Sequence, residues 1–159
     1  MSHIIISDLD GTLTNIMDEG PFETDEAYLA ARARDQLTQL GRLVLEMPRV
    51  VLLTGRRLAY ADATREWLAQ QGVEQLPLIS YRNDSISHND MVRDKGLRFA
   101  KQLRMLDGYH PRPTRVMVLE DDDEVLDLYR KLSVDYSIDT RQGYNFTFVK
   151  VTKGVARFL

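Results

Sequence analysis

The fold of this 159-residue chain is best predicted from one stretch near its start, Ile4-Ile5-Ile6-Ser7-Asp8-Leu9-Asp10-Gly11-Thr12-Leu13-Thr14. Its three consecutive β-branched apolar residues are typical of a buried strand in a parallel sheet. The strand leads directly into two carboxylates separated by one residue, and then into a Gly-Thr turn. The stretch therefore predicts a polar site where the first strand of the sheet ends.

The two carboxylates indicate which chemistry this site serves. In an extended segment Asp8 and Asp10 point the same way, because side chains alternate with period 2. Two like charges repel unless a cation or a shared proton neutralises them, and Mg²⁺ binds through carboxylates and phosphate oxygens. Gly11 allows a sharp turn close to a ligand, and the hydroxyl and amide of Thr12 can donate to an anion. The alternative is a polar turn after a strand, since Asp and Gly are ordinary turn residues.

Composition places the chain among globular proteins. With 43% hydrophobic and 28% charged residues, we expect a single domain over residues 1–159. A net charge of −3 argues against a protein that coats nucleic acid, which is normally basic. The chain has no cysteine, which excludes disulfides and thiolate chemistry. Because no signal peptide or membrane-spanning run is evident, we expect a soluble, cytoplasmic protein with no membrane partner.

Apolar runs and helical spacing predict the elements that follow. A loop or flap covers about residues 15–24, with Thr24 or Asp25 as the N-cap of a helix over 28–40, which Gly41 ends or breaks. Further helices are predicted at 58–71, 90–106 and 125–132, separated by strands at 49–54, 76–81, 115–119 and 134–138. We expect residues 143–159 to form a tail or an edge strand, centred on 146–151, or a contact between chains.

Strands that alternate with helices predict an α/β fold: a three-layer, doubly wound, mostly parallel sheet, with no cap beyond the flap. In such sheets ligands bind beyond the carboxyl ends of the strands, where the strand order switches. Asp8, Asp10, Thr54, Glu120 and Asp121 all follow predicted strands. We therefore expect them to converge on one edge of the sheet.

Two further segments offer groups that bind anions. Thr54 and Gly55 follow a strand, so the Thr hydroxyl and the Gly amide at a helix N-terminus would clamp a phosphate, with help from Arg56. The alternative is a strand-end turn with a solvated arginine. Lys95 is a candidate cation, because apolar residues lie four and eight positions beyond it. Arg93 and Lys101 are its competitors.

The acidic run Glu120-Asp121-Asp122-Asp123-Glu124 follows an apolar strand directly. It is interpreted either as a metal-binding segment or as a solvated helix start, which the helix dipole stabilises.

Taken together, these motifs resemble those of the haloacid-dehalogenase-like phosphohydrolases: Asp-x-Asp-Gly-Thr-Leu at 8–13, Thr54 after a strand, Lys95 on a helix, and the acidic run. Members usually have Asp-Asp or Gly-Asp where this chain has Glu120-Asp121. The resemblance implies Asp8 as nucleophile, Asp10 as general acid and base, and Thr54 and Lys95 as catalytic clamp residues. It also implies Mg²⁺ held by Asp8, the backbone carbonyl of Asp10 and Asp121. Aligning the strand ends makes Asp121 the favoured direct ligand, with Glu120 or Asp122 bridging through water. The resemblance further implies phosphate or substrate contacts from Gly11, Thr12, Gly55, Arg56 and Arg82.

The layout of residues 3–140 is also similar to the phosphatase domain of phage-type polynucleotide kinase-phosphatases. Both have a short flap, one helix before the second motif and a polar loop containing an arginine before the lysine helix. The similarity implies an open site for a nucleotide or a nucleic-acid-end phosphate. The alternatives are a phosphatase for small metabolites such as sugar phosphates, and a catalytically silent protein that binds phosphate.

Overall fold

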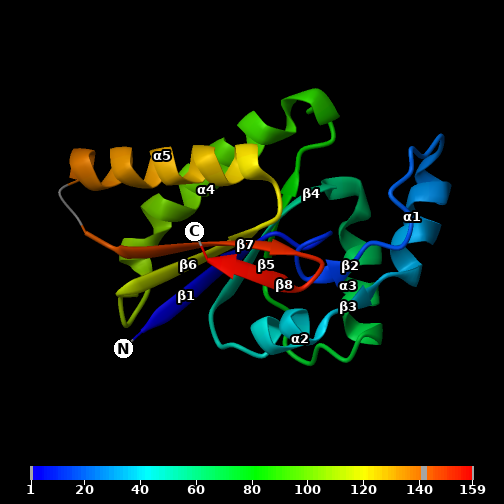
Figure 1. Cartoon of the computed structure of the whole chain (residues 1–159), viewed down its shortest axis with the longest axis horizontal. Helices are drawn as coiled ribbons and strands as arrows, with labels where there is room; N and C mark the ends of the chain where they lie inside the picture. Colours follow the sequence, from blue (N-terminus) through cyan, green and yellow to red (C-terminus); the bar gives the residue numbers. More distant parts are fainter. Residues whose placement is uncertain (1, 141–142, 159) are drawn as a thin grey trace.

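A six-stranded sheet runs through the protein in the computed structural model, which describes residues 2–140 and 143–158 (Figure 1). Its strands are β1 (His3–Ser7), β4 (Val50–Arg57), β5 (Leu78–Arg82), β6 (Arg115–Glu120), β7 (Asn145–Thr152) and β8 (Val155–Phe158). A small second sheet pairs β2 (Thr14–Asn15) with β3 (Gln36–Leu37). The α-helices are α1 (Asp25–Arg34), α2 (Gln39–Leu45), α3 (Ala61–Gln70), α4 (Met91–Met105) and α5 (Asp123–Thr140).

The strand order of the large sheet is β5-β4-β1-β6-β7-β8, and every neighbouring pair is parallel except β7 and β8. The chain builds β4 and β5 on one side of β1, and then returns to build β6 and β7 on the other side. The strand order therefore switches at β1. Ser7, the last residue of β1, pairs with Leu52 of β4 and Leu119 of β6, so the residue after it emerges between two strand ends. The predicted α/β fold with a mostly parallel sheet is confirmed.

Helices pack on both faces of this sheet (Figure 1). Ile4 and Ile6 of β1 lie in a core cluster with Phe99 of α4 and Tyr129 of α5, whereas Ile5 packs against the cluster that contains residues of α2 and α3. The alternation follows from the period-2 geometry of a strand that is covered on both sides. This explains why the first strand is a continuous apolar run.

The helix predicted over residues 28–40 is wrong in its extent. The chain forms α1, then pairs β3 with β2 as an antiparallel strand, and only then begins α2. Thr24 caps α1, as predicted, and Thr38 caps α2 by accepting from the Gly41 amide at 3.0 Å. The strand pairing at residues 36–37 outweighs the helical spacing, because tertiary contacts override a weak local propensity.

The strand predicted at residues 134–138 is also wrong, because α5 continues to Thr140. Tyr129 and Ser133 on this helix are buried, and Tyr136 packs against the same core, while Val134 and Ile138 are exposed. The β-branched residues thus occupy the solvent face of a helix whose other face carries the packing. Within the described ranges, none of the helices is both long enough and apolar enough to span a membrane.

The C-terminal segment forms a hairpin and not a tail. β7 spans the predicted strand at 146–151 but lies inside the sheet, between β6 and β8, so β8 is the edge strand. Leu159, the last residue of the predicted segment, lies outside the described residues. The helix predicted at 125–132 is present as α5, whose end lies eight residues later, at Thr140. The other predicted strands and helices are present with ends shifted by up to three residues, and residues 58–60 form a 3₁₀ turn before α3.

The base of the predicted flap is fastened to α1. Residues 16–23 contain no helix or strand. The buried Arg32 guanidinium donates to the Asp18 carbonyl, and the buried Asp35 carboxylate accepts from the Met17 amide at 3.1 Å. These contacts join the segment to α1 and to the residue that follows this helix.

Gly41, expected to end or break a helix, instead lies inside α2, where the helix meets the loop after β1. A Cβ atom added there would lie 2.3 Å from the carbonyl oxygen of Leu13. We expect Gly41→Ala to lower the free energy of unfolding in urea by about 1–3 kcal/mol, although alanine favours helices. Gly108→Ala is the matched control, since nothing lies within 4 Å of its added Cβ. Equal stabilities of the two variants would contradict this packing.

Candidate functional site

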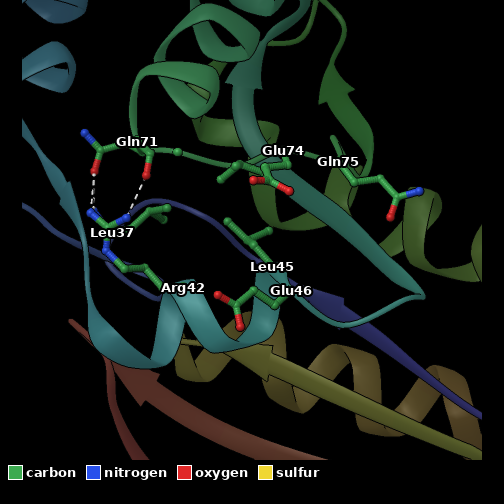
Figure 2. A pocket seen from close by; sticks show the side chains of 9 residues that line it. Leu37, Arg42, Leu45, Glu46, Gln71, Glu74 and Gln75 are labelled. Atoms are coloured by element: carbon green, nitrogen blue, oxygen red, sulfur yellow. Dashed lines mark hydrogen bonds between the residues drawn. The ribbon is translucent and has the colours of Figure 1, made fainter.

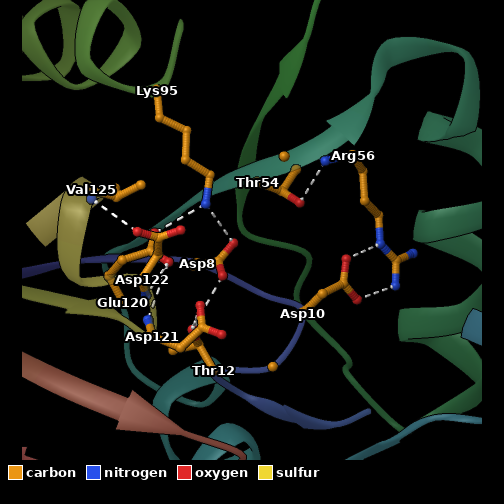
Figure 3. A network of polar contacts seen from close by, with 12 residues as sticks. Asp8, Asp10, Thr12, Thr54, Arg56, Lys95, Glu120, Asp121, Asp122 and Val125 are labelled. Carbon is orange, nitrogen blue, oxygen red and sulfur yellow. Dashed lines mark hydrogen bonds and ion pairs between the residues drawn. The ribbon is translucent and has the colours of Figure 1, made fainter. Parts of the chain in front are cut away.

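A buried ammonium group joins two carboxylates at the carboxyl edge of the sheet (Figure 3). The Nζ atom of Lys95 lies 3.1 Å from Oδ1 of Asp8 and 3.0 Å from Oε2 of Glu120. All three side chains are less than a tenth exposed. The structure thus brings Lys95 to Asp8 as predicted, while the competing Arg93 and Lys101 are exposed.

Three elements deliver these side chains. Asp8 follows β1, and its amide donates to the Leu119 carbonyl of β6 at 2.9 Å. Glu120 is the last residue of β6, and Lys95 lies in the first half of α4. Gly96 lets α4 approach α5, because an added Cβ would lie 2.5 Å from a methyl of Leu128. Close helix packing therefore brings the lysine stem over the strand ends.

Burial controls the electrostatics of this site. Desolvation raises the pKa of Asp8 from 3.8 to about 6, against the lowering effect of Lys95, and the Asp121 charge raises it further. Desolvation, followed by the charge of Asp8, raises the pKa of Glu120 well above its usual range. Desolvation lowers the pKa of Lys95, but the two carboxylates outweigh it and the net shift is upward. Lys95 therefore stays charged, and the carboxylates need more positive charge than it supplies.

Asp8, Glu120 and Asp121 form the carboxylate cluster of this site. Each offers one oxygen, and these oxygens lie within 4.8 Å of one another. With Lys95 the cluster has three potential negative charges against one positive charge, so a divalent cation would balance it. Carboxylate oxygens are hard ligands, which suits an ion such as Mg²⁺. The residues present therefore fit a metal ion.

The acidic run divides its functions among its members. The Asp122 carboxylate accepts from the amides of Glu124 at 2.9 Å and Val125 at 3.2 Å, so it caps α5. Glu120 uses one oxygen for Lys95 and the other for the Asp121 amide at 3.1 Å. Asp121 accepts only from the Thr12 hydroxyl among the hydrogen bonds of the described chain. This distribution favours Asp121 over Asp122 as the direct ligand.

Gly11 and Thr12 shape the loop beneath the cluster. Gly11 has a φ of +76°, and an added Cβ would lie 2.9 Å from Oδ2 of Asp121. The Thr12 hydroxyl lies 3.2 Å from Oδ2 of Asp8 and 3.3 Å from Oδ1 of Asp121. The expectation of a sharp turn at this glycine is confirmed. The contact of these two residues with a phosphate stays a prediction.

Asp10 points to a different partner from Asp8, contrary to the strand geometry expected from the sequence. β1 ends at Ser7 and a turn begins at Asp10, so the two residues do not share a strand. Both oxygens of Asp10 accept from Arg56, from Nε and Nη2 at 2.7 Å each (Figure 3). Arg56 also donates to the Thr64 hydroxyl at 3.1 Å and lies over the Trp67 ring. The guanidinium that was predicted to bind an anion is thus engaged by Asp10, and a direct phosphate contact stays a prediction.

Thr54 and Gly55 lie within β4, which continues to Arg57. The expectation that they sit at a helix N-terminus is therefore wrong. The Thr54 hydroxyl accepts from the Arg56 amide at 3.1 Å, and the Gly55 carbonyl accepts from Nε of Arg82 at 3.0 Å. Arg82 also donates to the Ile86 carbonyl at 2.6 Å, so it fastens the loop after β5 to β4. The roles of all three toward a phosphate stay predictions.

Tyr129 is a buried polar group beside the cluster that sequence reasoning missed. Its ring stacks on Phe99 at 4.2 Å, and its hydroxyl has no hydrogen-bond partner within the described part of the chain. Burial raises the pKa of this hydroxyl well above its usual range, so it stays protonated. The sequence places position 129 in a predicted helix, but nothing in it distinguishes this hydroxyl from that of an ordinary tyrosine.

A cavity of about 380 Å³ lies away from these residues, between the end of α2 and the segment after α3 (Figure 2). Its lining includes Leu45 and Glu46, which precede β4, and Val73 and Glu74, which precede β5. These residues belong to the amino edge of the sheet, opposite the carboxylate cluster. The cavity is therefore separate from the candidate site.

The raised pKa of Asp8 predicts how stability depends on pH without metal. Between pH 4 and 6 the folded state keeps a proton that the unfolded state releases, so this stabilisation is complete below pH 3.8 and is lost as pH rises through 6. Removing the Asp8 carboxyl group should therefore raise the free energy of unfolding at neutral pH. In EDTA, we expect the free energy of unfolding of Asp8→Asn, relative to that of the wild type, to rise by up to about 3 kcal/mol between pH 4 and pH 7.5. Urea denaturation measures both values. A difference that does not change with pH would contradict the burial effect.

No family model matches the chain, and no curated protein does so either. Solved structures do show similarity. One chain from a structure of the Pnkp1/Rnl/Hen1 RNA repair complex is 25% identical, with a TM-score of 0.59, over 82% of this chain and 39% of that chain. Another, from a structure of the Pnkp1/Rnl/Hen1 complex, is 27% identical, with a TM-score of 0.52, over 82% and 43%. The structural neighbours are thus chains of an RNA repair complex, and this chain spans less than half of their length.

Proposed function

We propose that the protein is a Mg²⁺-dependent phosphomonoesterase that works through an aspartyl-phosphate on Asp8. The observation that carries the proposal is the carboxylate cluster with its buried Lys95, located where the strand order switches. A phosphate group brings negative charge, so a site for it needs cations that are fixed before it arrives. Lys95 is one such cation, and the unbalanced charge of the cluster calls for a second.

Asp8 is the proposed nucleophile because the residues around it fix its position. An oxygen of Asp8 attacks phosphorus and forms the acyl-phosphate bond, while the bond from phosphorus to the leaving alkoxide breaks in line. Asp10, which must enter this step as the protonated acid, gives its proton to that alkoxide and becomes a carboxylate. A water molecule then attacks phosphorus, Asp10 takes its proton, and the Asp8 carboxylate leaves with inorganic phosphate as the product.

The surrounding side chains orient the carboxylates of Asp8 and Asp10 and neutralise their charge. Lys95 holds one oxygen of Asp8, Thr12 holds the other, and Arg56 fixes the plane of the Asp10 carboxylate. When bound by Asp8, Asp121 and the backbone carbonyl of Asp10, Mg²⁺ would lower the repulsion between an anionic nucleophile and an anionic phosphate. Glu120 keeps Lys95 in place from the other side.

We propose a nucleic-acid end or a nucleotide as the source of the phosphate. The neighbours described as parts of an RNA repair complex support this class of substrate. The insertion between β2 and β3 is also short, since it holds little more than residues 16–23 and α1. A site without a large cap domain accommodates a bulky or polymeric substrate.

Hydrolysis of p-nitrophenyl phosphate tests the chemistry. We expect release of p-nitrophenol that depends on Mg²⁺ and disappears in EDTA. Asp8→Asn should lower kcat on the order of a thousandfold or more, because the nucleophile is lost. Asp122→Asn is the matched control: asparagine still caps a helix, so kcat should stay within about twofold. A wild-type protein that is inactive with Mg²⁺, Mn²⁺ and Co²⁺ would contradict the proposed activity.

A panel of phosphomonoesters tests the substrate class. We expect kcat/KM for 3′- or 5′-phosphorylated oligonucleotides or mononucleotides to exceed that for ribose 5-phosphate and glucose 6-phosphate on the order of tenfold or more. The preference reflects contacts that a free sugar cannot make. Comparable values across the panel would point to a phosphatase of small metabolites.

A further inference from the structure

A two-residue turn, Lys153-Gly154, joins β7 to β8. Thr152 pairs with Val155 across it, and the φ angles of its two residues are +48° and +79°. Both residues therefore occupy the left-handed region, as in a type I′ hairpin turn. Lys153 alone among the described non-glycine residues has a positive φ. Such strain persists where surrounding contacts hold it, and it concentrates at functional sites.

The contacts that hold this turn come from the loop after β1. The Lys153 amide donates to the Gly11 carbonyl at 2.6 Å, and the Gly154 amide donates to the Thr12 carbonyl at 2.9 Å. In a two-residue hairpin turn these central amides take no part in the strand ladder, so they are free to bind elsewhere. Here both bind consecutive carbonyls of the loop whose Thr12 hydroxyl contacts Asp8 and Asp121.

The turn is also wedged against the start of α2. A Cβ atom added to Gly154 would lie 2.4–2.7 Å from the side-chain atoms of Thr38. Thr38 is itself fixed, because its amide and hydroxyl donate to the Leu13 carbonyl at 2.9 and 3.1 Å. Glycine at position 154 thus meets two demands, a positive φ and the absence of a side chain. Any larger residue would push the turn away from Thr12.

We propose that the Lys153-Gly154 turn is a positioning element for the candidate site. It holds the Gly11–Thr12 loop so that the Thr12 hydroxyl stays in contact with the carboxylates of Asp8 and Asp121. The inference rests on the proposed function for its kinetic consequence but not for its structural one. It assigns a role to the C-terminal hairpin, a segment in which the sequence shows no chemical motif. Both residues act through their backbone amides, so neither is a catalytic residue.

Amide hydrogen exchange of the wild-type protein, followed by NMR, tests the structural part. We expect the Lys153 and Gly154 amides to exchange on the order of a hundredfold more slowly than in an unstructured peptide, although they lie in a surface hairpin turn. Exchange at the unstructured rate would overturn the inference. This result does not depend on whether the protein is a phosphatase.

Gly154→Ala tests the kinetic part, with Gly72→Ala as its matched control. Gly72 has a φ of +88°, but nothing lies within 4 Å of its added Cβ, so the control carries the backbone strain without the clash at the loop. We expect Gly154→Ala to lower kcat for p-nitrophenyl phosphate on the order of tenfold to a hundredfold with KM within about twofold. In the same variant, amides of residues 8–14 should exchange faster. Gly72→Ala should match wild type in both readouts.

The two readouts separate the possible outcomes. Equal kcat and equal exchange of residues 8–14 in the two variants would contradict the positioning role. If the wild-type protein hydrolyses nothing, the proposed function fails, and exchange of residues 8–14 in Gly154→Ala still decides the inference. If Gly154→Ala does not fold, slow exchange of the two turn amides in the wild-type protein supports the inference, and fast exchange overturns it.

Discussion

A single buried ammonium group, that of Lys95, makes the polar edge of this fold possible. Asp8 follows β1, Glu120 ends the adjacent parallel strand β6, and burial of the two carboxylates would be very costly without a cation between them. Replacing such a pair with apolar residues often stabilises a protein, so the stability of the fold does not by itself account for these charges. Three carboxyl groups gather around this one ammonium group, and the proposed metal ion would balance the charge that they carry when ionised.

The surrounding structure keeps two acidic residues of one short loop apart. Asp8 is held by Lys95 and Thr12, whereas Asp10 is held by Arg56. Two carboxylates in two such environments can take different parts in one reaction, one as nucleophile and the other in proton transfer. The C-terminal hairpin adds a third support, because its turn amides bind the carbonyls of the same loop. The loop is therefore held by side chains of α4 and β4 and by the turn between β7 and β8.

Much of this arrangement could be predicted from the sequence. Continuous apolar strands at Ile4–Ile6 and before Glu120 determine a parallel sheet, and a parallel sheet brings the residues after its strands to one edge. The sequence favours Lys95 over Arg93 as the cation because apolar residues lie four and eight positions beyond Lys95. The end of β1 at Ser7, and hence the direction of Asp10, depends on a turn whose geometry the residue types do not specify.

The features that could not be predicted depend on contacts between distant segments. The break between α1 and α2 arises from pairing of residues 36–37 with β2. Val134 and Ile138 suggest a strand, but the packing face of α5 lies elsewhere on the helix. An anomalous diffraction map of crystals soaked in Mn²⁺ near pH 7.5 would locate a metal ion at the carboxylate cluster. We expect one strong peak within about 2.5 Å of carboxylate oxygens of Asp8 and Asp121. A map with Lys95 still paired to Asp8 and no peak at the cluster would rule out the proposed metal site.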